Sequence, residues 1–229
     1  MVSVHGRASA WAIPLALAPL VTIGILDGLY KGALYAATPA GFWVADAAKF
    51  LLLPAIALVA LARVADIRPR DYGLRWPRTR AQRADLVGAT LLSVIALPMV
   101  YEVATSLCWQ LLRDDEAPAF AYAATLPEAG PLRWLAVAYF ALTAGVVEEI
   151  LFRGLPWLWL SGRPGLPVRQ TLFVIGTSVL FALTHWENGL PELLATCAYG
   201  IAAAFLYLRL GSLWPLVAAH VVTDLFILA

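Results

Sequence analysis

The 229-residue sequence has little charge: 14% of its residues are Asp, Glu, Lys or Arg, whereas 62% are hydrophobic. A soluble domain usually carries about a quarter charged residues, and so little polar surface cannot cover so much apolar side chain. The scarcity of charge therefore excludes a soluble cytosolic enzyme, a disordered chain and a nucleic-acid-binding protein. Together with a mean hydropathy of +0.78, it predicts a polytopic helical membrane protein.

Cysteine is also scarce, and several catalytic patterns are missing. Cys108 and Cys197 lie inside apolar runs, so we expect small buried side chains rather than a disulfide framework. The apolar stretches are continuous rather than alternating, which argues against a transmembrane β-barrel. They contain no serine or cysteine nucleophile with a plausible base, and the compact zinc spacing HExxH is absent.

Seven apolar segments are present, and most reach the roughly 20 residues that a helix needs to cross a hydrocarbon core. Backbone polar groups cannot remain unpaired in lipid, so each segment is expected to be helical. The predicted fold class is all-α, a transmembrane bundle of about seven spans, with six to eight as the range. The segments are Ala8–Tyr30, Phe42–Ala65, Ala84–Leu112, Leu132–Leu160, Val168–Trp186, Pro191–Leu208 and Ser212–Ala229.

The first segment is interpreted as a span rather than a cleaved signal peptide, because it is long, holds two prolines and continues into further spans.

The distribution of basic residues predicts the orientation of the protein in the membrane. Seven of the 16 lie between Arg63 and Arg83, in the connection after the second segment. The positive-inside rule predicts that this connection and the N-terminus are cytoplasmic, in a bacterial plasma (inner) membrane. We interpret the cluster as a topology signal and headgroup contact, not as a catalytic site.

Ionisable residues inside apolar segments are costly and therefore informative. They are Glu148, Glu149 and Arg153 in the fourth segment, His185 in the fifth, and His220 and Asp224 in the last. Glu149 and Arg153 share a helix face, with the acid N-terminal to the base, as a pair prefers. The same spacing lets Asp224 orient the imidazole of His220. Two neighbouring carboxylates repel each other, which disfavours a role limited to interhelical hydrogen bonds.

Other polar residues in the segments have simpler interpretations. Asp27 with Lys31, and Asp46 with Lys49, have helical spacing and are expected to pair within their helices. Glu102 has no local partner and is a candidate for lining a cavity. Trp186, which follows His185, is expected to shape the site.

Three short motifs resemble the signature of a known family. Residues 148–154 read as EExxxR, residues 181–185 as FxxxH, and residues 220–224 as HxxxD. In this order, each on its own segment, they resemble the motifs of the CAAX-protease and bacteriocin-processing (CPBP, or Abi) family of intramembrane glutamate proteases. The resemblance implies a catalytic core at residues 132–229 within one membrane domain, residues 1–229. Residues 1–131 would form N-terminal helices without an assigned role.

The resemblance implies peptide hydrolysis by activated water. Glu148 would be the general base, and His185 would hold and polarise the water. His220 is the expected donor to the developing oxyanion. An ionised Asp224 cannot donate, so it orients His220 or stays protonated. The supporting residues would be Glu149, Arg153 and Phe181.

Alternatives remain open at this point. No cofactor is expected, but Glu148, His185 and His220 would bind Zn²⁺ if their helices converged. The expected partners are the lipid bilayer and a membrane-anchored or terminal-peptide protein substrate, with no nucleic acid and an open oligomeric state. Membrane Glu, His and Arg also suit a proton- or ion-coupled carrier, and a non-catalytic immunity or scaffold protein is a third hypothesis. The two histidines fall at different depths along their segments, which predicts either a fifth helix that begins in the cytoplasm or helices that are tilted or staggered.

Overall fold

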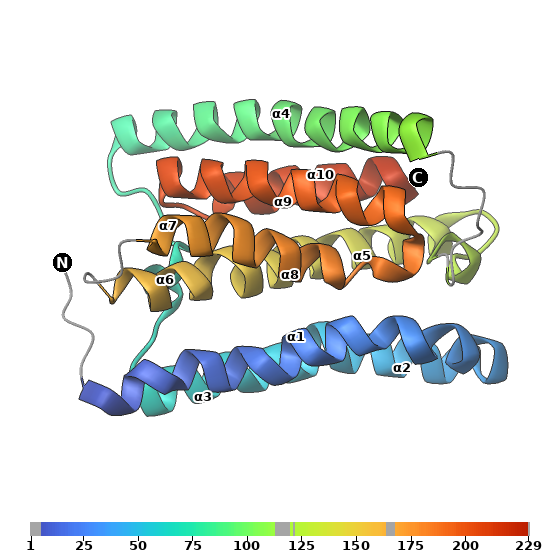
Figure 1. The fold of residues 1–229 in the computed structure, drawn as a ribbon, viewed down its shortest axis with the longest axis horizontal. Helices are drawn as coiled ribbons and strands as arrows, with labels where there is room; N and C mark the ends of the chain where they lie inside the picture. The colour runs from blue at the N-terminus through green and yellow to red at the C-terminus, as the bar shows by residue number, and fades with distance from the viewer. Residues whose placement is uncertain (1–5, 113–119, 121, 164–167, 229) are drawn as a thin grey trace.

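The structure is a computed structural model that describes residues 6–112, 120, 122–163 and 168–228 (Figure 1). These residues contain no strand and form seven continuous helices, three of them interrupted by a π-helical turn, which confirms the all-α fold class and the count of about seven. In chain order the helices are α1 (Gly6–Ala37); α2 (Pro39–Ala47), η1 (Ala48–Leu52) and α3 (Leu53–Ala65); α4 (Arg80–Leu112); α5 (Pro131–Glu149), η4 (Ile150–Gly154) and α6 (Leu155–Ser161); α7 (Arg169–Thr171), η5 (Leu172–Gly176) and α8 (Thr177–Leu183); α9 (Leu190–Leu210); and α10 (Trp214–Leu228). Short 3₁₀ turns occur at η2 (Pro69–Tyr72), η3 (Tyr122–Thr125) and η6 (Trp186–Asn188).

The π turns have a local cause in two of the three helices. Each of η1 and η4 directly precedes a helix whose second residue is a proline, Pro54 in α3 and Pro156 in α6. Proline has no N–H group, and its ring collides with the carbonyl oxygen four residues earlier, so a wider turn relieves the clash. π turns are frequent at functional sites, and η4 contains Arg153.

Five of the described helices are long and apolar enough to cross a membrane, which makes this a multi-pass membrane protein. They are Trp11–Ala37, Pro39–Ala65, Arg80–Leu112, Pro131–Ser161 and Leu190–Leu210, while Arg169–Leu183 and Trp214–Leu228 are apolar but shorter. Helix α5–η4–α6 is the most buried: 61% of its most apolar window is buried, against 17% for α4. It is therefore the central helix of the bundle.

The other helices surround the central helix in layers (Figure 1). Helix α1 and the helix α2–η1–α3 pack together on one face, and α4 covers the opposite face. Between them, α10 packs against α4 and α5, while α9 packs against α4 and α8. Both cysteines, Cys108 and Cys197, are free and only partly buried, rather than fully buried as predicted.

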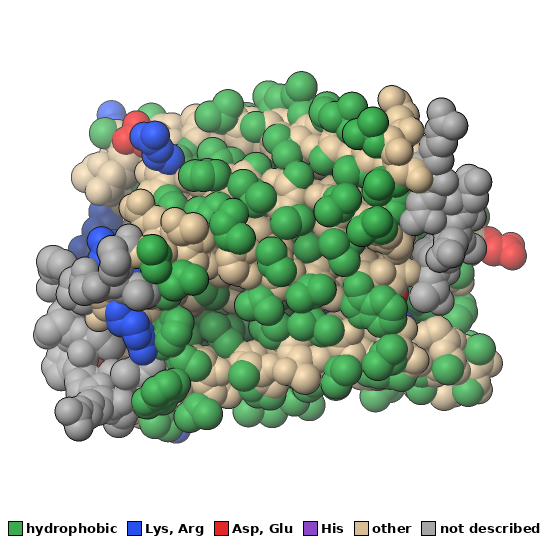
Figure 2. Space-filling model, in the orientation of Figure 1, with side chains coloured by type: hydrophobic (Ala, Val, Ile, Leu, Met, Phe, Trp, Pro, Cys, Tyr) green, Lys and Arg blue, Asp and Glu red, His purple; other side chains and the backbone are tan. Residues whose placement is uncertain are grey.

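The surface matches a bilayer in its distribution of polarity (Figure 2). Hydrophobic side chains cover the middle of the helices, and lysines and arginines gather near one end. That end carries the connection from α3 to α4, the connection from α6 to α7, and the turn from α9 to α10 (Figure 1). The basic connection Arg63–Arg83 therefore shares one end of the bundle with Arg169 and Arg209.

Candidate active site

Glu149, in the last turn of α5, joins two other buried side chains. Its Oε1 atom accepts a hydrogen bond from Nη1 of Arg153 at 3.0 Å and from Nδ1 of His220 on α10 at 2.8 Å. Glu149 and Arg153 are both 0% exposed. A buried charge needs a hydrogen-bonded partner of opposite sign, and Arg153 supplies it. The predicted pair of Glu149 with Arg153 is therefore present, and Glu149 also connects this pair to His220 on a second helix.

The ring of His220 is oriented by Glu149, not by Asp224. The short bond to Glu149 uses Nδ1, whereas Asp224 Oδ1 lies 3.8 Å from Nε2, beyond hydrogen-bond distance. The spacing of four residues within α10 suggested the other partner, but the closer contact comes across the interface between α5 and α10. Because a carboxylate only accepts, Nδ1 carries the donated proton, and Nε2 faces the carboxylates of Asp224 and Glu148, the latter at 3.6 Å.

Close packing of α5 against α10 makes this arrangement possible. A Cβ atom on Gly145 would lie 2.7 Å from Cγ2 and 3.2 Å from the backbone nitrogen of Val221. Only a glycine allows such an approach one turn before Glu148 and Glu149. No motif in the sequence marked Gly145 as part of the site, although its position three residues before the two glutamates is a usable signal.

Phe181 on α8 lies against both histidines. Its ring centroid is 4.9 Å from that of His185 and 5.9 Å from that of His220. The guanidinium carbon of Arg153 lies 4.5 Å from the same ring centroid, in a cation–π contact. Phe181 is 2% exposed, so this one ring connects the two histidines and the buried arginine. The sequence placed the two histidines at different depths along their segments, but in the structure both contact the ring of Phe181.

His185 lies just beyond a helix rather than within one. The predicted segment continued to Trp186, but α8 ends at Leu183. The backbone N–H groups of Thr184 and His185 bond three residues back, to Phe181 and Ala182, and the Thr184 hydroxyl also donates to the Phe181 carbonyl at 2.7 Å. Such side-chain bonds to backbone compete with helix continuation.

The turn also selects the tautomer of His185. Its Nδ1 lies 3.0 Å from the carbonyl oxygen of Phe181, which can only accept, so Nδ1 is the protonated nitrogen. Nε2 is then the nitrogen that can accept a proton. Among the described residues, His185 forms no ion pair with Glu148 or Asp224, and no group of three or more His, Cys, Asp or Glu side chains is arranged to hold a metal ion.

Glu148 is the carboxylate that reaches a pocket. It is 8% exposed, and its Oε2 atom has no hydrogen-bond partner among the described residues. The pocket lies between the central helix and the N-terminal helices, and Lys49 and Thr184 are its other polar side chains. Its remaining lining residues are Leu20, Ile23, Gly24, Phe50, Leu53, Val147, Leu151 and Phe152.

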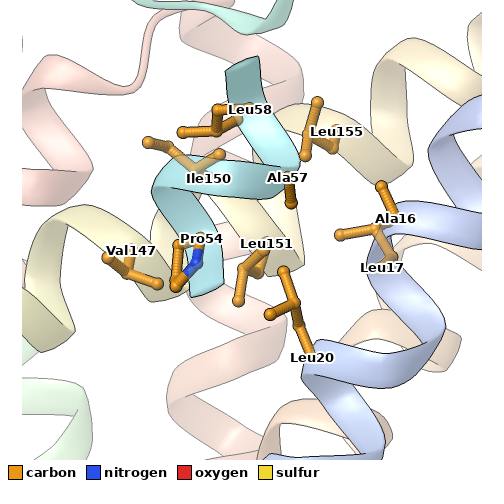
Figure 3. Close-up of a pocket in the computed structure, with 10 residues that line it drawn as sticks. All are labelled: Ala16, Leu17, Leu20, Pro54, Ala57, Leu58, Val147, Ile150, Leu151 and Leu155. Carbon is orange, nitrogen blue, oxygen red and sulfur yellow. The ribbon is translucent and has the colours of Figure 1, made fainter. Parts of the chain in front are cut away.

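A second pocket adjoins the first and is entirely apolar (Figure 3). The two pockets share Leu20, Val147 and Leu151. Residues of α1, α3 and the central helix point into this second space from opposite sides. Helices for which the sequence suggested no role thus form one wall of both pockets.

The remaining predicted pairs are partly wrong. Asp27 and Lys31 do pair, at 3.7 Å. Lys49, however, pairs with Asp27 of α1 and not with Asp46, which instead accepts a hydrogen bond from Tyr139 at 2.9 Å. The π turn η1 begins at Ala48 and interrupts the helical register on which the Asp46–Lys49 pair depended.

Glu102 has no contact with the site. It is exposed on α4 and lines neither of the two pockets. The hypothesis that Glu102 lines a cavity is therefore wrong for both of these pockets.

The site is thus a buried set of carboxylates, imidazoles and one guanidinium in a polytopic helical membrane protein. Residues 130–226 match the family model described as type II CAAX prenyl endopeptidase Rce1-like, a member of the CPBP family. Over these residues the chain is similar to CPBP-family hydrolases of the CAAX-protease type. The match contains all three motifs and leaves residues 1–129 unmatched. Comparison with curated proteins and with solved structures found no match.

Proposed function

We propose that this protein is an intramembrane endopeptidase that hydrolyses a peptide bond of a membrane-associated protein or peptide, using water activated by Glu148 and His185. The observation that carries the proposal is the free Oε2 atom of Glu148. It is buried and without a hydrogen-bond partner among the described residues, yet it belongs to a side chain that lines a pocket. A general base needs such an atom, within reach of a water and not committed to a structural partner.

The roles of the neighbouring residues follow from their contacts. Glu149 is the poorer base, because Arg153 and His220 both bond to its Oε1 atom and the residue is 0% exposed and lines neither pocket. His220 keeps Nε2 for the substrate, 3.6 Å from Glu148, a separation that a water bonded to both groups would bridge. In the proposed reaction His185 holds the water, Glu148 removes its proton, and the water oxygen attacks the carbonyl carbon. His220, protonated at both ring nitrogens beside its carboxylate neighbours, donates a hydrogen bond from Nε2 to the oxyanion. The oxyanion then collapses, the C–N bond breaks, and Glu148 passes its proton to the leaving amine.

The proposed reaction uses no metal ion. In support, His185 is not grouped with Glu148 and His220 as a third ligand among the residues that the structure describes. Activity should therefore persist after dialysis against a chelator such as EDTA. A loss of activity that Zn²⁺ restores would contradict the metal-independent reaction.

The proposed substrate is a terminal peptide or membrane-anchored segment, and the family model adds prenylated CAAX termini as one class. The apolar pocket beside Glu148 (Figure 3) supports a substrate with an apolar portion next to the scissile bond. We further propose a bacterial plasma (inner) membrane, with the N-terminus and the connection Arg63–Arg83 in the cytoplasm. The gathering of basic side chains near one end of the bundle supports this orientation.

The decisive experiment compares protein termini in the native host by mass spectrometry, with wild type and with a chromosomal Glu148→Ala allele. We expect new, uncleaved termini on a few envelope proteins in the mutant. His185→Ala should give the same termini. Glu102→Ala is the matched control, because it removes an exposed carboxylate of α4 that lines neither pocket.

Identical termini in wild type and mutant, with the Glu148 variant still present in the membrane, would contradict the proposed function. The carrier and scaffold hypotheses would then gain support, and they separate from each other in a flux assay. A carrier would lose transport on substitution of Glu148, whereas a scaffold would have no transport to lose.

A further inference from the structure

A second buried cluster of charged side chains joins the N-terminal helices, outside the family match, to Glu187 within it. Lys31 on α1 pairs directly with Glu187 of η6, and the two residues are 2% and 3% exposed. Lys31 also lies 3.7 Å from Asp27, which pairs in turn with Lys49 of η1. These four residues form a continuous chain of ion pairs that joins both N-terminal helices to the turn after His185.

Close packing accompanies the ion pair at the same place. A Cβ atom on Gly28 would lie 2.9 Å from Cζ2 of Trp186 and 3.0 Å from Cβ of Glu187. The indole Nε1 of Trp186 donates a hydrogen bond to the carbonyl oxygen of Ile25 at 2.8 Å. Helix α1 therefore contacts the two residues that directly follow His185, through both main-chain and side-chain atoms.

The surroundings of Lys31 strengthen its attraction for Glu187. The ammonium group lies 3.4 Å from the hydroxyl of Tyr122 and over two aromatic rings, 4.5 Å from the centroid of Tyr122 and 5.3 Å from that of Phe120. Burial, followed by the negative charge of Asp27, keeps the pKa of Tyr122 well above its ordinary value, so this ring remains neutral. Charges enclosed by apolar groups are screened less than charges in water.

The turn is closed by backbone hydrogen bonds from Asn188 to His185 and from Gly189 to Trp186, and its contacts with α1 are made by Trp186 and Glu187. His185, Trp186 and Glu187 follow the end of α8, and Gly189, with a φ of 93°, begins the entry to α9. Thr184, at the start of the turn, lines the same pocket as Glu148. Any displacement of this turn would move His185 relative to the carboxylate that it is proposed to assist.

We infer that Lys31 is a positioning residue, which acts through Glu187 to hold the turn of His185 in place for catalysis. The inference rests on the proposed function and extends it to the N-terminal helices. Lys31 does not contact the reacting atoms. It sets where His185 lies, and a displacement of about 1 Å in a catalytic group can lower a rate by about 100-fold.

The test measures kcat and KM of the full-length purified protein in lipid vesicles. The probe is an internally quenched peptide that spans the cleavage site found in the host comparison. Lys31→Met should lower kcat about 10- to 100-fold, with KM changed less than about threefold. Lys31→Arg retains the charge and should restore kcat to within about fivefold of wild type. A change in fold alone would not lower kcat while leaving KM nearly unchanged, and Lys31→Arg would not restore kcat.

A second measurement needs no substrate. Amide hydrogen exchange should become faster in residues 184–189 of the Lys31→Met variant, and should be unchanged in α10. Arg68→Met is the control, because it breaks an exposed pair with Asp66, at 2.9 Å, far along the chain from the turn. Wild-type kcat in Lys31→Met, or unchanged exchange in the turn, would overturn the inference.

If Lys31→Met fails to fold, the variant Gly28→Ala tests the same inference. It adds one methyl group against Trp186 and leaves every charge in place, and kcat should fall about 3- to 10-fold. A wild-type kcat in this variant would also overturn the inference. Failure of the proposed function is distinct, because Glu148→Gln would then cleave as wild type does. An inactive Glu148→Gln beside a fully active Lys31→Met refutes only the role of Lys31.

Discussion

Replacing Arg153 with methionine tests the buried charge cluster most directly. The side chain is 0% exposed, so the substitution keeps much of its length and volume but removes the positive charge. It breaks the 3.0 Å bond between Arg153 Nη1 and Glu149 Oε1 and the cation–π contact with Phe181 at 4.5 Å. Glu149 would then keep a single partner, the imidazole of His220.

The expected loss follows from these contacts. Removing one partner of a buried ion pair costs about 3–5 kcal/mol, because the other charge remains buried without compensation. Loss of a desolvated cation–π contact adds about 2 kcal/mol. Two guanidinium nitrogens of Arg153, Nε and Nη2, have no hydrogen-bond partner among the described residues, and removing them returns about 1–3 kcal/mol. The net loss of unfolding free energy should be about 3–5 kcal/mol.

Reversible unfolding in mixed micelles, followed by circular dichroism, measures this loss. The double variant Glu149→Gln/Arg153→Met should be more stable than Arg153→Met by about 2 kcal/mol, since it removes the uncompensated charge. Arg68→Met is the control, since an exposed pair contributes about 0–1 kcal/mol. The reasoning is refuted if the unfolding free energy of Arg153→Met lies within about 1 kcal/mol of that of wild type. It is also refuted if the losses of the single variants Glu149→Gln and Arg153→Met add up to the loss of the double variant.

Two further substitutions test the geometry around His220. Gly145→Ala places a methyl group 2.7 Å from Val221 Cγ2, and the resulting separation of α5 and α10 should cost about 1–3 kcal/mol and lower kcat at least about tenfold. Gly88→Ala, with nothing within 4 Å, should leave unfolding and kcat unchanged or slightly improve stability. Asp224→Leu should lose most of kcat, because it removes the polar group that lies 3.8 Å from Nε2 of His220, whereas Asp224→Asn keeps a polar group there and should retain kcat within about tenfold. Wild-type turnover in Gly145→Ala or in Asp224→Leu would contradict these roles.

Composition and local spacing were sufficient to predict the helices and part of the site. The scarcity of charge predicted the all-α bundle, since lipid leaves a continuous apolar segment no alternative to helix. A spacing of four residues predicted the pair of Glu149 with Arg153 and the contact of Phe181 with His185. Both contacts lie within one helix or at its end, where the distance along the chain determines the distance in space.

Contacts between helices could not be predicted in the same way. The bond from Glu149 to His220 joins residues 71 positions apart, and the bond from Lys31 to Glu187 joins residues 156 positions apart. Local spacing instead suggested Asp224 and Asp46 as partners for His220 and Lys49. The suggestion for Lys49 was wrong, and Asp224 lies 3.8 Å from His220, farther than Glu149 at 2.8 Å, because a short distance across a packed interface overrides a favourable spacing within one helix. The end of α8 before His185 was also missed, since it depends on side-chain bonds of Thr184.

The pocket that Glu148 lines is formed in part by the N-terminal helices. The family model begins at residue 130, and all the motif residues lie beyond it. Yet one wall of the Glu148 pocket is built by Leu20, Lys49 and other residues of α1, η1 and α3. A substrate that reaches Glu148 must therefore pass side chains that the family motifs do not specify. The charged chain from Lys49 to Glu187 fixes those same helices to the turn of His185. In the proposed mechanism the C-terminal helices hold the chemistry, while the N-terminal helices line the pocket and position His185.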